Sequence, residues 1–317
     1  MVLCVCLNAG IDKTFVLDDF ALKGIYRPRE VLTYVGGKGV NLARVLRTLG
    51  VDCLAMGMLG GHAGDLCREL LDAEGIRHDF TRPRREARYA LCFVCPARGV
   101  HTEVNELGPE ISEEELGEVL DKYQWYLPKA SFVAICGSAP PGAPADIYCT
   151  MVNQARERGV PVLLDVSRQW LVEGARGLPD YLKPNVVELA QLLQADPDLR
   201  EAEMSIEEAG RAAQELCRRG MRAVVVTLGG KGALATDGER VYHAWAPAAE
   251  VKSAIGSGDA LAAGFIERLV AGAGLAEALR RGVACGAANA TVYGAGFCTR
   301  ESIAAHEGSV DMREIDV

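Results

Sequence analysis

A carboxylate follows directly on a glycine-rich turn in the segment Ile255-Gly256-Ser257-Gly258-Asp259. Apolar residues at helical spacing come next, so the glycines open a helix, and the N–H groups at its start would form an anion hole. Phosphoryl transfer needs a carboxylate that takes a hydroxyl proton and donors that bind phosphate oxygens, and this segment has both. An Asp in the first turn of a helix can also simply complement the helix dipole. We favour the chemical role.

A second glycine-rich turn, Gly36-Gly37-Lys38-Gly39, also precedes a helix. Apolar residues at i, i+3, i+4 and i+7 predict that helix, and they are Leu42, Val45, Leu46 and Leu49. Gly50 stands where a C-terminal glycine cap belongs. The glycines let the backbone approach a ligand, and the helix start with Lys38 favours a hydroxyl-rich or anionic molecule, although the spacing is not that of a Walker A motif. A tight turn before a core helix remains an alternative.

Short apolar runs that alternate with longer amphipathic ones must position these two turns. This alternation predicts an α/β fold with a largely parallel sheet. We predict strands at residues 2–7, 53–58, 132–136, 160–165, 181–183 and 222–228, and helices at 64–74, 112–126, 144–158, 205–219 and 275–293. Two further stretches, 15–34 and 88–105, have no helical period and predict a small β lid outside the main sheet. No repeat or linker divides the chain, so we expect one domain over residues 1–317.

Composition narrows the classes of function. The 317 residues contain 34 Lys and Arg against 43 Asp and Glu, and this net charge of -9 argues against nucleic acid as the main partner. We expect no membrane partner and a cytoplasmic location, because no apolar run could cross a bilayer and no basic signal region begins the chain. The 11 cysteines suit buried reduced thiols better than disulfides. Cys92 and Cys95 form a single C-x-x-C pair, which favours two packed thiols over a zinc site.

In this order, the two glycine-rich segments resemble the two signatures of the PfkB family, the ribokinase-like sugar kinases, and the resemblance runs from Asn8 to about Ser302. Three segments between them are similar to the family's SGSxPxG, KPNxxEL and TxGxxG motifs, and these are residues 136–142, 182–189 and 227–232. The joint match is more specific than either turn. It implies a ribokinase-like three-layer α/β/α fold with a mostly parallel central sheet and a small β lid.

The resemblance also implies roles for individual residues, with ATP and Mg²⁺ as the cofactors. Asp259 would be the catalytic base, and the anion hole would consist of the amides of Gly256, Ser257 and Gly258. The sugar would be held by Asp12, Gly37, Lys38 and Asn41. Mg²⁺ and the nucleotide phosphates would be organised through water by Asn185 and Glu188. The nucleotide site would be lined by Lys183, Thr227, Gly229 and Gly232, with Asn289 near the adenine.

Within the family, the chain looks most like the branch of 1-phosphofructokinase and tagatose-6-phosphate kinase. Residues 8–14 resemble its NPAIDKT start, and residues 102–109 resemble its TExNExGP run. A substrate that already carries a phosphate needs cations and donors at the end away from the reacting hydroxyl. The candidates are Lys38, Arg88 and Ser138, with Arg27 in the lid. Either arginine could instead be a solvated surface residue.

The reaction expected from this resemblance is transfer of the γ-phosphoryl group of MgATP to a primary hydroxyl of a ketohexose phosphate. Fructose 1-phosphate, which would give fructose 1,6-bisphosphate, is the first choice, and tagatose 6-phosphate is the close alternative. A catalytically silent sugar-binding protein on the same fold is a further alternative. Ala9-Gly10 in place of the family's Pro-Ala leaves the sugar open, and Ser253 in place of the Asp of ribokinases predicts little dependence on K⁺. We expect a homodimer through the lid.

Overall fold

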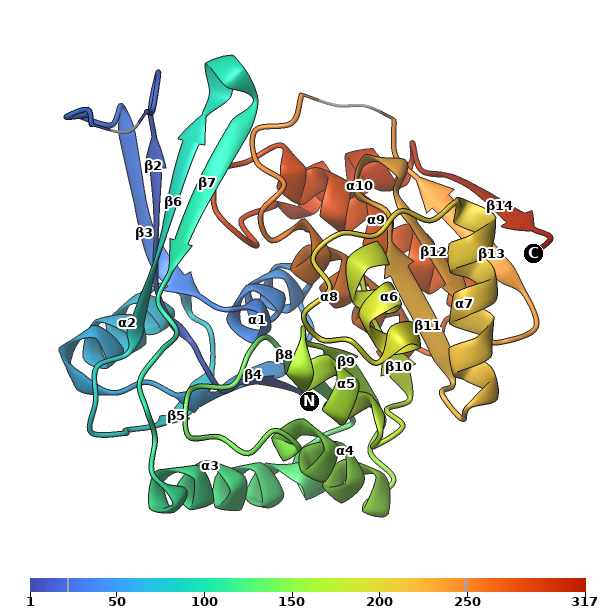
Figure 1. The fold of residues 1–317 in the computed structure, drawn as a ribbon, viewed down its shortest axis with the longest axis horizontal. Helices are drawn as coiled ribbons and strands as arrows, with labels where there is room; N and C mark the ends of the chain where they lie inside the picture. Colours follow the sequence, from blue (N-terminus) through green and yellow to red (C-terminus); the bar gives the residue numbers. More distant parts are fainter. Residues whose placement is uncertain (22, 248–249) are drawn as a thin grey trace.

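One long sheet runs through the middle of the molecule (Figure 1). The computed structural model describes residues 1–21, 23–247 and 250–317. Within them, the strands of this sheet are β1 (Val2–Cys6), β4 (Cys53–Met58), β5 (His78–Thr81), β8 (Phe132–Cys136), β9 (Val162–Asp165), β10 (Tyr181–Leu182), β11 (Ala223–Thr227), β12 (Ala233–Thr236), β13 (Val241–Trp245) and β14 (Asp311–Ile315). Their order is β14-β13-β12-β11-β10-β9-β8-β1-β4-β5. The pairs from β11 to β5 are parallel, and those from β11 to β14 are antiparallel.

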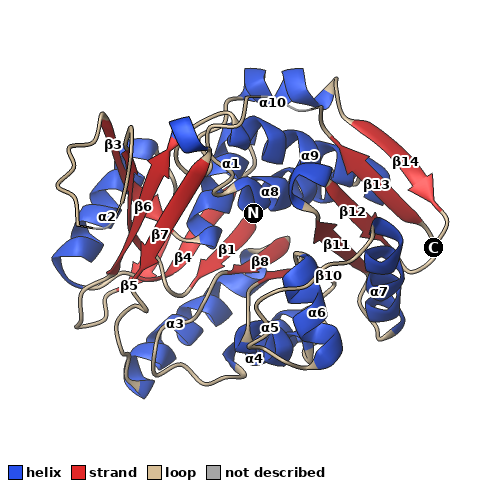
Figure 2. Cartoon of the chain, turned by 45° about the horizontal axis from the view of Figure 1, so that its top comes forward, coloured by secondary structure: helices blue, strands red, loops and turns tan. Residues whose placement is uncertain are grey.

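Helices cover both faces of this sheet (Figures 1 and 2). One layer consists of α1 (Lys38–Leu49), α2 (Gly61–Glu74), α8 (Ser257–Val270), α9 (Leu275–Ala290) and α10 (Arg300–Glu307). The other consists of α3 (Glu113–Tyr126), α4 (Ile147–Glu157), α5 (Gln169–Ala175), α6 (Val186–Gln194) and α7 (Ile206–Arg218). Along β1, Cys4 packs with the first layer, and Leu3 and Val5 pack with the second. Both faces are therefore buried, which explains the apolar strands and confirms the predicted three-layer α/β/α arrangement.

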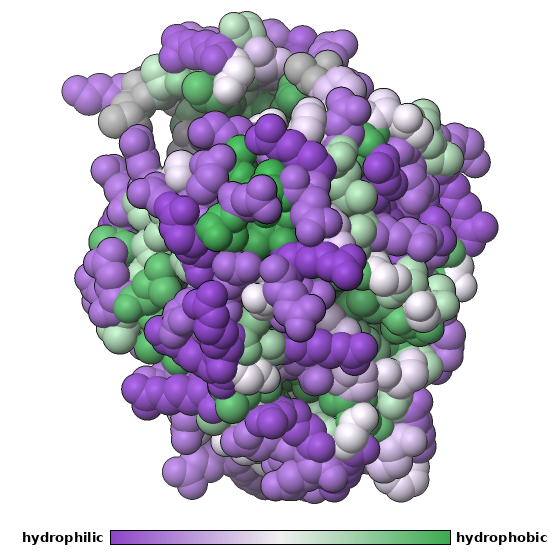
Figure 3. All heavy atoms as spheres, turned by 90° about the vertical axis from the view of Figure 1, so that its right-hand side faces the viewer, coloured by the Kyte–Doolittle hydropathy of each residue, from purple (hydrophilic) through white to green (hydrophobic). Residues whose placement is uncertain are grey.

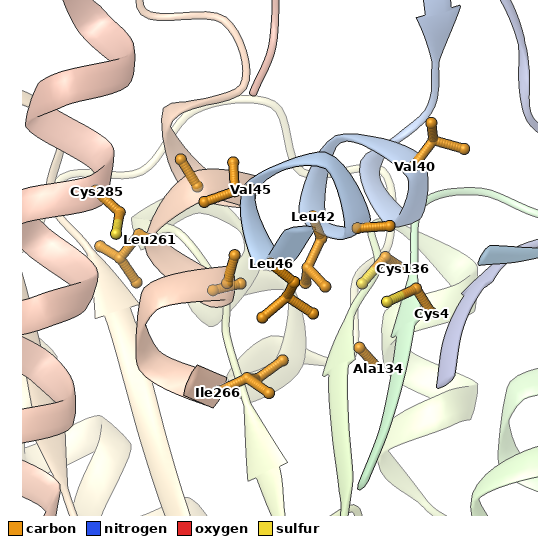
Figure 4. Packing of buried hydrophobic residues seen from close by; sticks show 14 of the residues in the cluster. Cys4, Val40, Leu42, Val45, Leu46, Ala134, Cys136, Leu261, Ile266 and Cys285 are labelled. Atoms are coloured by element: carbon orange, nitrogen blue, oxygen red, sulfur yellow. The ribbon is translucent and has the colours of Figure 1, made fainter. Parts of the chain in front are cut away.

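The helix predicted after the second glycine-rich turn is α1, and it packs on the sheet beside α8 (Figure 4). Leu42 and Leu46 point into this core, near Ile266 of α8, as their spacing predicts. Gly50 ends the helix with φ 80°, in the left-handed conformation that favours glycine, and its N–H donates to carbonyls of the last turn.

A second sheet stands at one end of the main sheet (Figure 1). This lid sheet consists of β2 (Gly10–Val16), β3 (Glu30–Gly36), β6 (Arg88–Cys95) and β7 (Val100–Asn105), in the order β3-β2-β6-β7. It confirms the predicted small β lid. Its first strand begins at Gly10, five residues before the predicted stretch, because a glycine and the charged residues Asp12 and Lys13 are uncommon in strands and obscured the pattern.

Several boundaries differ from the predictions. The helix α2 begins at Gly61, three residues before its predicted start, because paired glycines read as a loop. The predicted capping boxes at Ser112 and Ser205 are both confirmed. The unpredicted elements are mostly short, and they are α5, α6, α10, β5, β12, β13 and β14. Elements of this length have too few periods for apolar spacing to reveal them.

The surface at the β14 end of the molecule is mostly hydrophilic, with small hydrophobic groups between the polar side chains (Figure 3). Among the described residues, no helix has both the length and the apolar character needed to span a bilayer. The cysteines are free thiols, and all but Cys149 are buried, as predicted.

Gly264 marks a close approach of α8 to α9. A Cβ at this position would lie 2.6 Å from Cys285 Sγ and 2.8 Å from the Arg281 carbonyl oxygen, which belongs to helix backbone. We expect Gly264→Ala to lower the free energy of unfolding by about 1–3 kcal/mol through overpacking. The matched control is Gly117→Ala in α3, where a Cβ would meet nothing within 4 Å. Alanine at position 117 should raise the free energy of unfolding by about 0.5–1 kcal/mol.

Urea unfolding measures both effects. A Gly264→Ala protein as stable as the wild type would contradict this packing of α8 on α9.

Candidate active site

Strand ends and helix starts from distant parts of the chain meet beside the base of the lid sheet. The strands β1, β8, β9 and β10 are neighbours in the main sheet, and α1 and α8 begin near their carboxyl ends (Figure 2). In open α/β sheets, ligands bind in the crevice outside the carboxyl ends of the strands. Most of the predicted site residues collect in this place.

Asp259 lies in the first turn of α8 and is 7% exposed. The preceding Gly256 has φ 78°, and a Cβ there would lie 2.4 Å from a neighbouring side chain, so both conformation and space require glycine. Nδ2 of Asn41, in α1, donates to Oδ2 of Asp259 at 2.9 Å. Of the predicted anion-hole amides, that of Ser257 donates within the turn, to the Ala254 carbonyl at 3.2 Å. The predicted base and one predicted sugar-site residue are thus joined directly.

The pKa of Asp259 suits a base that works near neutral pH. Burial, followed by the Asp165 carboxylate, raises the pKa of Asp259 to about 6. Lys38, the hydrogen bond from Asn41, and Lys183 act in the opposite direction. The carboxyl group is therefore ionised at neutral pH and still basic enough to accept a proton.

Asp165, the last residue of β9, holds two lysines. Its Oδ1 lies 2.8 Å from Lys38 Nζ, its Oδ2 lies 2.9 Å from Lys183 Nζ, and the residue is 1% exposed. Burial alone would raise the pKa of Asp165, but Lys183 and Lys38 hold that pKa below its usual value. Desolvation would lower the pKa of Lys38, but the carboxylates of Asp165, Glu188 and Asp259 raise it well above its usual value. Lys38 is therefore a fixed positive charge beside Asp259, and Lys183 is held by the same Asp165 carboxylate.

Sequence reasoning missed Asp165. A signal was present, because a single carboxylate ends the otherwise apolar run 160–165. Charges at the carboxyl end of a parallel strand lie where ligands bind, so this position could have been found.

Asn8, two residues after the end of β1, joins three further segments. Its Nδ2 donates to the Leu107 carbonyl at 2.9 Å and to Ser138 Oγ at 3.2 Å, and its carbonyl accepts from Arg88 Nε at 2.8 Å. Ser138 and Arg88, both predicted for the phosphate of the substrate, are thereby brought together. Asn8 was not predicted as a site residue, although it too follows a buried strand.

Asp12 projects from β2 over the turn before α1. A Cβ on Gly36 would lie 1.9 Å from Asp12 Cγ, so glycine is needed to leave room for the carboxylate. Burial raises the pKa of Asp12 to about 6, against the opposing charges of Arg88 and Arg44. Oδ1 of Asp12 is buried and has no hydrogen-bond partner among the described residues. A buried acceptor without a donor is destabilising, so this oxygen is suited to receive a hydroxyl from a ligand.

Two predicted site residues are not placed as expected, and Arg27 is the first. The hairpin of β2 and β3 extends away from the site, and Arg27 is exposed in the loop at its far end. Within this chain, the structure does not bring Arg27 near the other predicted site residues. Its place within the lid segment gave no indication of which end of the hairpin it occupies.

Asn289, in α9, is the second. It is fully buried, and its Nδ2 donates to the Ile255 carbonyl at 2.8 Å and to Ser257 Oγ at 3.3 Å. Its Oδ1 accepts from the N–H of Gly296 at 2.7 Å. The side chain therefore supports the turn before α8 from below and does not face a surface open to an adenine. The motif match located the residue along the chain but not on a face of its helix.

The predicted nucleotide residues form a neighbouring group. A β-bridge joins Asn185 to Thr227. Oδ1 of Asn185 accepts from the Glu188 N–H and the Glu188 carboxylate accepts from the Asn185 N–H, each at 2.9 Å, which is a capping box at the start of α6. Gly232 has φ 86°, and a Cβ there would lie 2.1 Å from a backbone carbonyl oxygen. At Gly229, a Cβ would meet nothing within 4 Å, so this turn is open to a ligand.

The donors present fit a magnesium ion held with substrate phosphates. Among the described residues, no group of three or more His, Cys, Asp or Glu could bind a metal alone. Mg²⁺ usually keeps several waters and binds one or two carboxylates together with phosphate oxygens. Oε1 of Glu188 lies 3.9 Å from Lys38 Nζ, so the Glu188 carboxylate stands beside the lysine pair where such phosphates would bind.

Comparison with known proteins places the chain among sugar kinases. The sequence profile of pfkB family carbohydrate kinases matches residues 7–302. A possible 1-phosphofructokinase from Thermotoga maritima has a TM-score of 0.88 at 25% identity, with 99% of each chain covered. The tetrameric inhibited form of phosphofructokinase-2 from Escherichia coli has a TM-score of 0.87 at 26% identity, covering 97% of this chain and 98% of that one.

The raised pKa of Asp259 predicts that this carboxylate destabilises the fold. Between pH 3.8 and about 6, the folded protein binds a proton that the unfolded chain releases. The stability that comes from the protonated carboxyl is therefore lost as the pH rises through this window, by up to about 3 kcal/mol. We expect Asp259→Asn to be more stable than the wild type at pH 7.5, with the difference shrinking toward pH 4.

Urea unfolding at the two pH values measures this difference. The exposed Asp121→Asn is the matched control and should change stability by less than about 0.5 kcal/mol at either pH. An Asp259→Asn protein less stable than the wild type at pH 7.5 would refute the burial argument.

Proposed function

The chain belongs to the pfkB family of carbohydrate kinases, and we propose that it transfers the γ-phosphoryl group of MgATP to a primary hydroxyl of a ketohexose phosphate. As a member of this family, it is a phosphotransferase with a sugar hydroxyl as acceptor. The observation that carries the proposal is the buried Asp259, with its pKa near 6, beside the positive charges of Lys38 and Lys183. Fructose 1-phosphate is the preferred substrate, and tagatose 6-phosphate is the alternative.

In this reaction the sugar hydroxyl loses its proton and gains the phosphoryl group. The sugar hydroxyl oxygen bonds to the γ-phosphorus, the bond to the bridging oxygen breaks, ADP leaves with that electron pair, and Asp259 takes the hydroxyl proton. Lys38, Lys183 and the N-terminus of α8 stabilise charge on the phosphoryl oxygens. Mg²⁺ neutralises further phosphate charge when bound, and Asn185 and Glu188 would hold it through water.

The sugar phosphate would be bound at both ends. Asp12 Oδ1 accepts from a sugar hydroxyl, which gives this buried oxygen its missing donor. Arg88 uses Nε for the Asn8 carbonyl, and its remaining guanidinium N–H groups with Ser138 Oγ are left for the phosphate. The lid sheet would exclude water from the γ-phosphoryl group and so limit hydrolysis of ATP.

A silent sugar-binding protein is the weaker candidate. Such a protein would have no need for a buried carboxylate that destabilises the fold, and it would not need the group formed by Asn185, Glu188 and Thr227. ATP as a substrate and free thiols throughout the described chain support a cytoplasmic location.

Asp259→Asn should lower kcat at least about 10³-fold, because the amide cannot accept the hydroxyl proton. The Kd for the sugar phosphate should change less than about threefold, since Asp12, Arg88 and Ser138 remain. ADP formation with a panel of ketohexose 1- and 6-phosphates gives kcat, and calorimetric titration gives Kd. Asp121→Asn is again the control. Turnover near the wild-type rate in Asp259→Asn would contradict the role of the base, and a wild type inactive on every sugar phosphate would favour the silent alternative.

We further propose a homodimer formed through the lid sheet. Asp12 lies on one face of this sheet, and because cross-strand partners share a face, the opposite face can be identified from the register. That face contains Phe15, Val31, Leu91, Phe93, Val100 and Val104. Val31, Val100 and Val104 are 48%, 52% and 56% exposed, respectively. An exposed apolar face of this kind favours burial against a second copy of the chain.

Val104→Lys should weaken this dimer at least about tenfold, because a charge would be buried in the apolar face. The control is Val270→Lys at the end of α8, where the valine is 42% exposed and outside the lid sheet. Sedimentation equilibrium measures the association of each protein. A wild type that stays monomeric at micromolar concentration, or a Val104→Lys protein that associates like the control, would refute the lid dimer.

A further inference from the structure

Arg44, in α1, is a buried arginine to which no role has been given above. It is 4% exposed and lies one helical turn after Asn41. Its guanidinium group donates to Glu74 Oε2 at 2.5 Å and Oε1 at 3.0 Å, to Asn41 Oδ1 at 3.1 Å, to the Ala295 carbonyl at 2.9 Å and to the Val35 carbonyl at 2.8 Å. The side chain thus connects α1 and α2 with the lid sheet and the segment after α9.

The contact with Asn41 fixes the orientation of that amide. A guanidinium group has donors and no acceptor, so the oxygen of the Asn41 amide must face Arg44. The NH₂ group then points the other way, where it donates to Asp259 Oδ2 at 2.9 Å. The reversed amide would place its oxygen against the carboxylate and its N–H groups against the guanidinium, which is unfavourable on both sides.

A donor directed at a carboxylate favours the ionised form. We propose that Arg44 is a positioning residue for the transfer reaction: by fixing Asn41, it holds Asp259 ionised and oriented to take the proton of the sugar hydroxyl. This inference rests on the proposed function of Asp259 as the base. Arg44 itself does not touch Asp259 and acts through Asn41.

A second path leads from Arg44 to the same helix start. Arg44 binds the Ala295 carbonyl, and the next residue, Gly296, donates to Asn289. Asn289 in turn holds Ile255 and Ser257, which precede Asp259. These hydrogen bonds, together with the backbone from Ala295 to Gly296 and from Ser257 to Asp259, form a closed ring. Within it, Arg44 supports both the Asp259 carboxylate and the turn that precedes it.

The lid is also attached to this ring. The guanidinium carbon lies 4.6 Å from the ring centroid of Phe297 and 5.6 Å from that of Tyr34, in β3. These distances permit cation–π attraction, and the two aromatic rings stand edge to face at 5.3 Å. Arg44 thereby fixes the base of β3 relative to Asp259, across the space that the sugar would occupy.

Other ionisable groups face Asp259 and set the background against which Arg44 acts. These groups are Lys38 of α1, Asp165 of β9, Cys6 of β1, Cys136 of β8 and Lys183, which follows β10. From α6, the Glu188 carboxylate reaches Lys38. A substitution at Arg44 changes none of these groups, but the charge of Arg44 also lowers the pKa of Asp12, so its loss would raise that pKa as well. The comparison of the wild-type and Asp259→Asn backgrounds below isolates the part that acts on Asp259.

The first test is the pH dependence of kcat/KM for Arg44→Gln. Without the guanidinium, the Asn41 amide is free to turn, and the acidic limb of the profile should move up by about one pH unit. The loss should be mainly in kcat, about tenfold or more at pH 6.5 and smaller at pH 9, with little change in KM. Arg44→Lys keeps a charge and is the milder variant, for which we expect a smaller shift in the same direction.

Arg47→Gln is the matched control, because Arg47 lies in the same helix and is exposed, and within the described part of the chain its side chain donates only to the Gly75 carbonyl at 3.1 Å. Its profile should match the wild type. If folded Arg44→Gln and Arg44→Lys proteins both keep the wild-type profile, the proposal is overturned.

A second test needs no substrate. If Arg44 stabilises the ionised carboxylate, Arg44→Gln should lower Tm at pH 7.5 more in the wild-type background than in the Asp259→Asn background, by at least about 2 °C. At pH 4.5, where Asp259 is protonated, the two losses should be equal. A purely structural arginine would give equal losses at both pH values, which would overturn the proposal.

This second test also separates the two claims. A wild type that turns over no sugar phosphate would overturn the proposed function, and the difference in Tm would still decide whether Arg44 controls the ionisation of Asp259.

Discussion

The rest of the site depends on the buried pairing of Asp165 with Lys38 and Lys183. A carboxylate that is 1% exposed must be paired, and two lysines from different segments are held to it at 2.8 and 2.9 Å. Asp165 thereby holds two ammonium groups beside Asp259, and the Glu188 carboxylate lies 3.9 Å from Lys38 Nζ. Lys38 and Lys183 keep the pKa of Asp259 from rising further, and their ammonium groups would attract the oxygens of a transferred phosphoryl group.

No single element could bring these groups together. Asn41 and Asp259 are 218 residues apart in the chain, yet they share a hydrogen bond because α1 and α8 pack side by side on one face of the sheet. Glycines let other segments close in around this pair. A Cβ at Gly36, Gly256 or Gly264 would meet an atom of Asp12, Ala295 or Cys285, respectively, within 2.6 Å. Close packing of the helix layer is therefore a condition for the chemistry and not only for stability.

Much of the fold could be predicted from the sequence, and less of the site. Apolar runs predict the long strands, and apolar spacing together with capping boxes such as Ser112 with Glu115 predicts the helices. Residues in motifs were also located along the chain. The sequence does not show where a side chain points. Asn289 is buried beneath a turn, and Arg27 lies at the far end of a hairpin. Asp165 reaches Lys183 because β9 and β10 are neighbours, and it reaches Lys38 because α1 begins beside the end of β9. These facts arise from packing between segments distant in the chain.

The most direct measurement of the central claim is ³¹P nuclear magnetic resonance of the protein with MgATP and a ketohexose phosphate. If Asp259 activates a sugar hydroxyl, the γ-phosphoryl signal of ATP should be replaced by the second signal of a sugar bisphosphate, in amounts equal to the ADP formed. ADP accompanied by inorganic phosphate alone, with the sugar phosphate unchanged, would mean that water and not the sugar is the acceptor, and it would contradict the account.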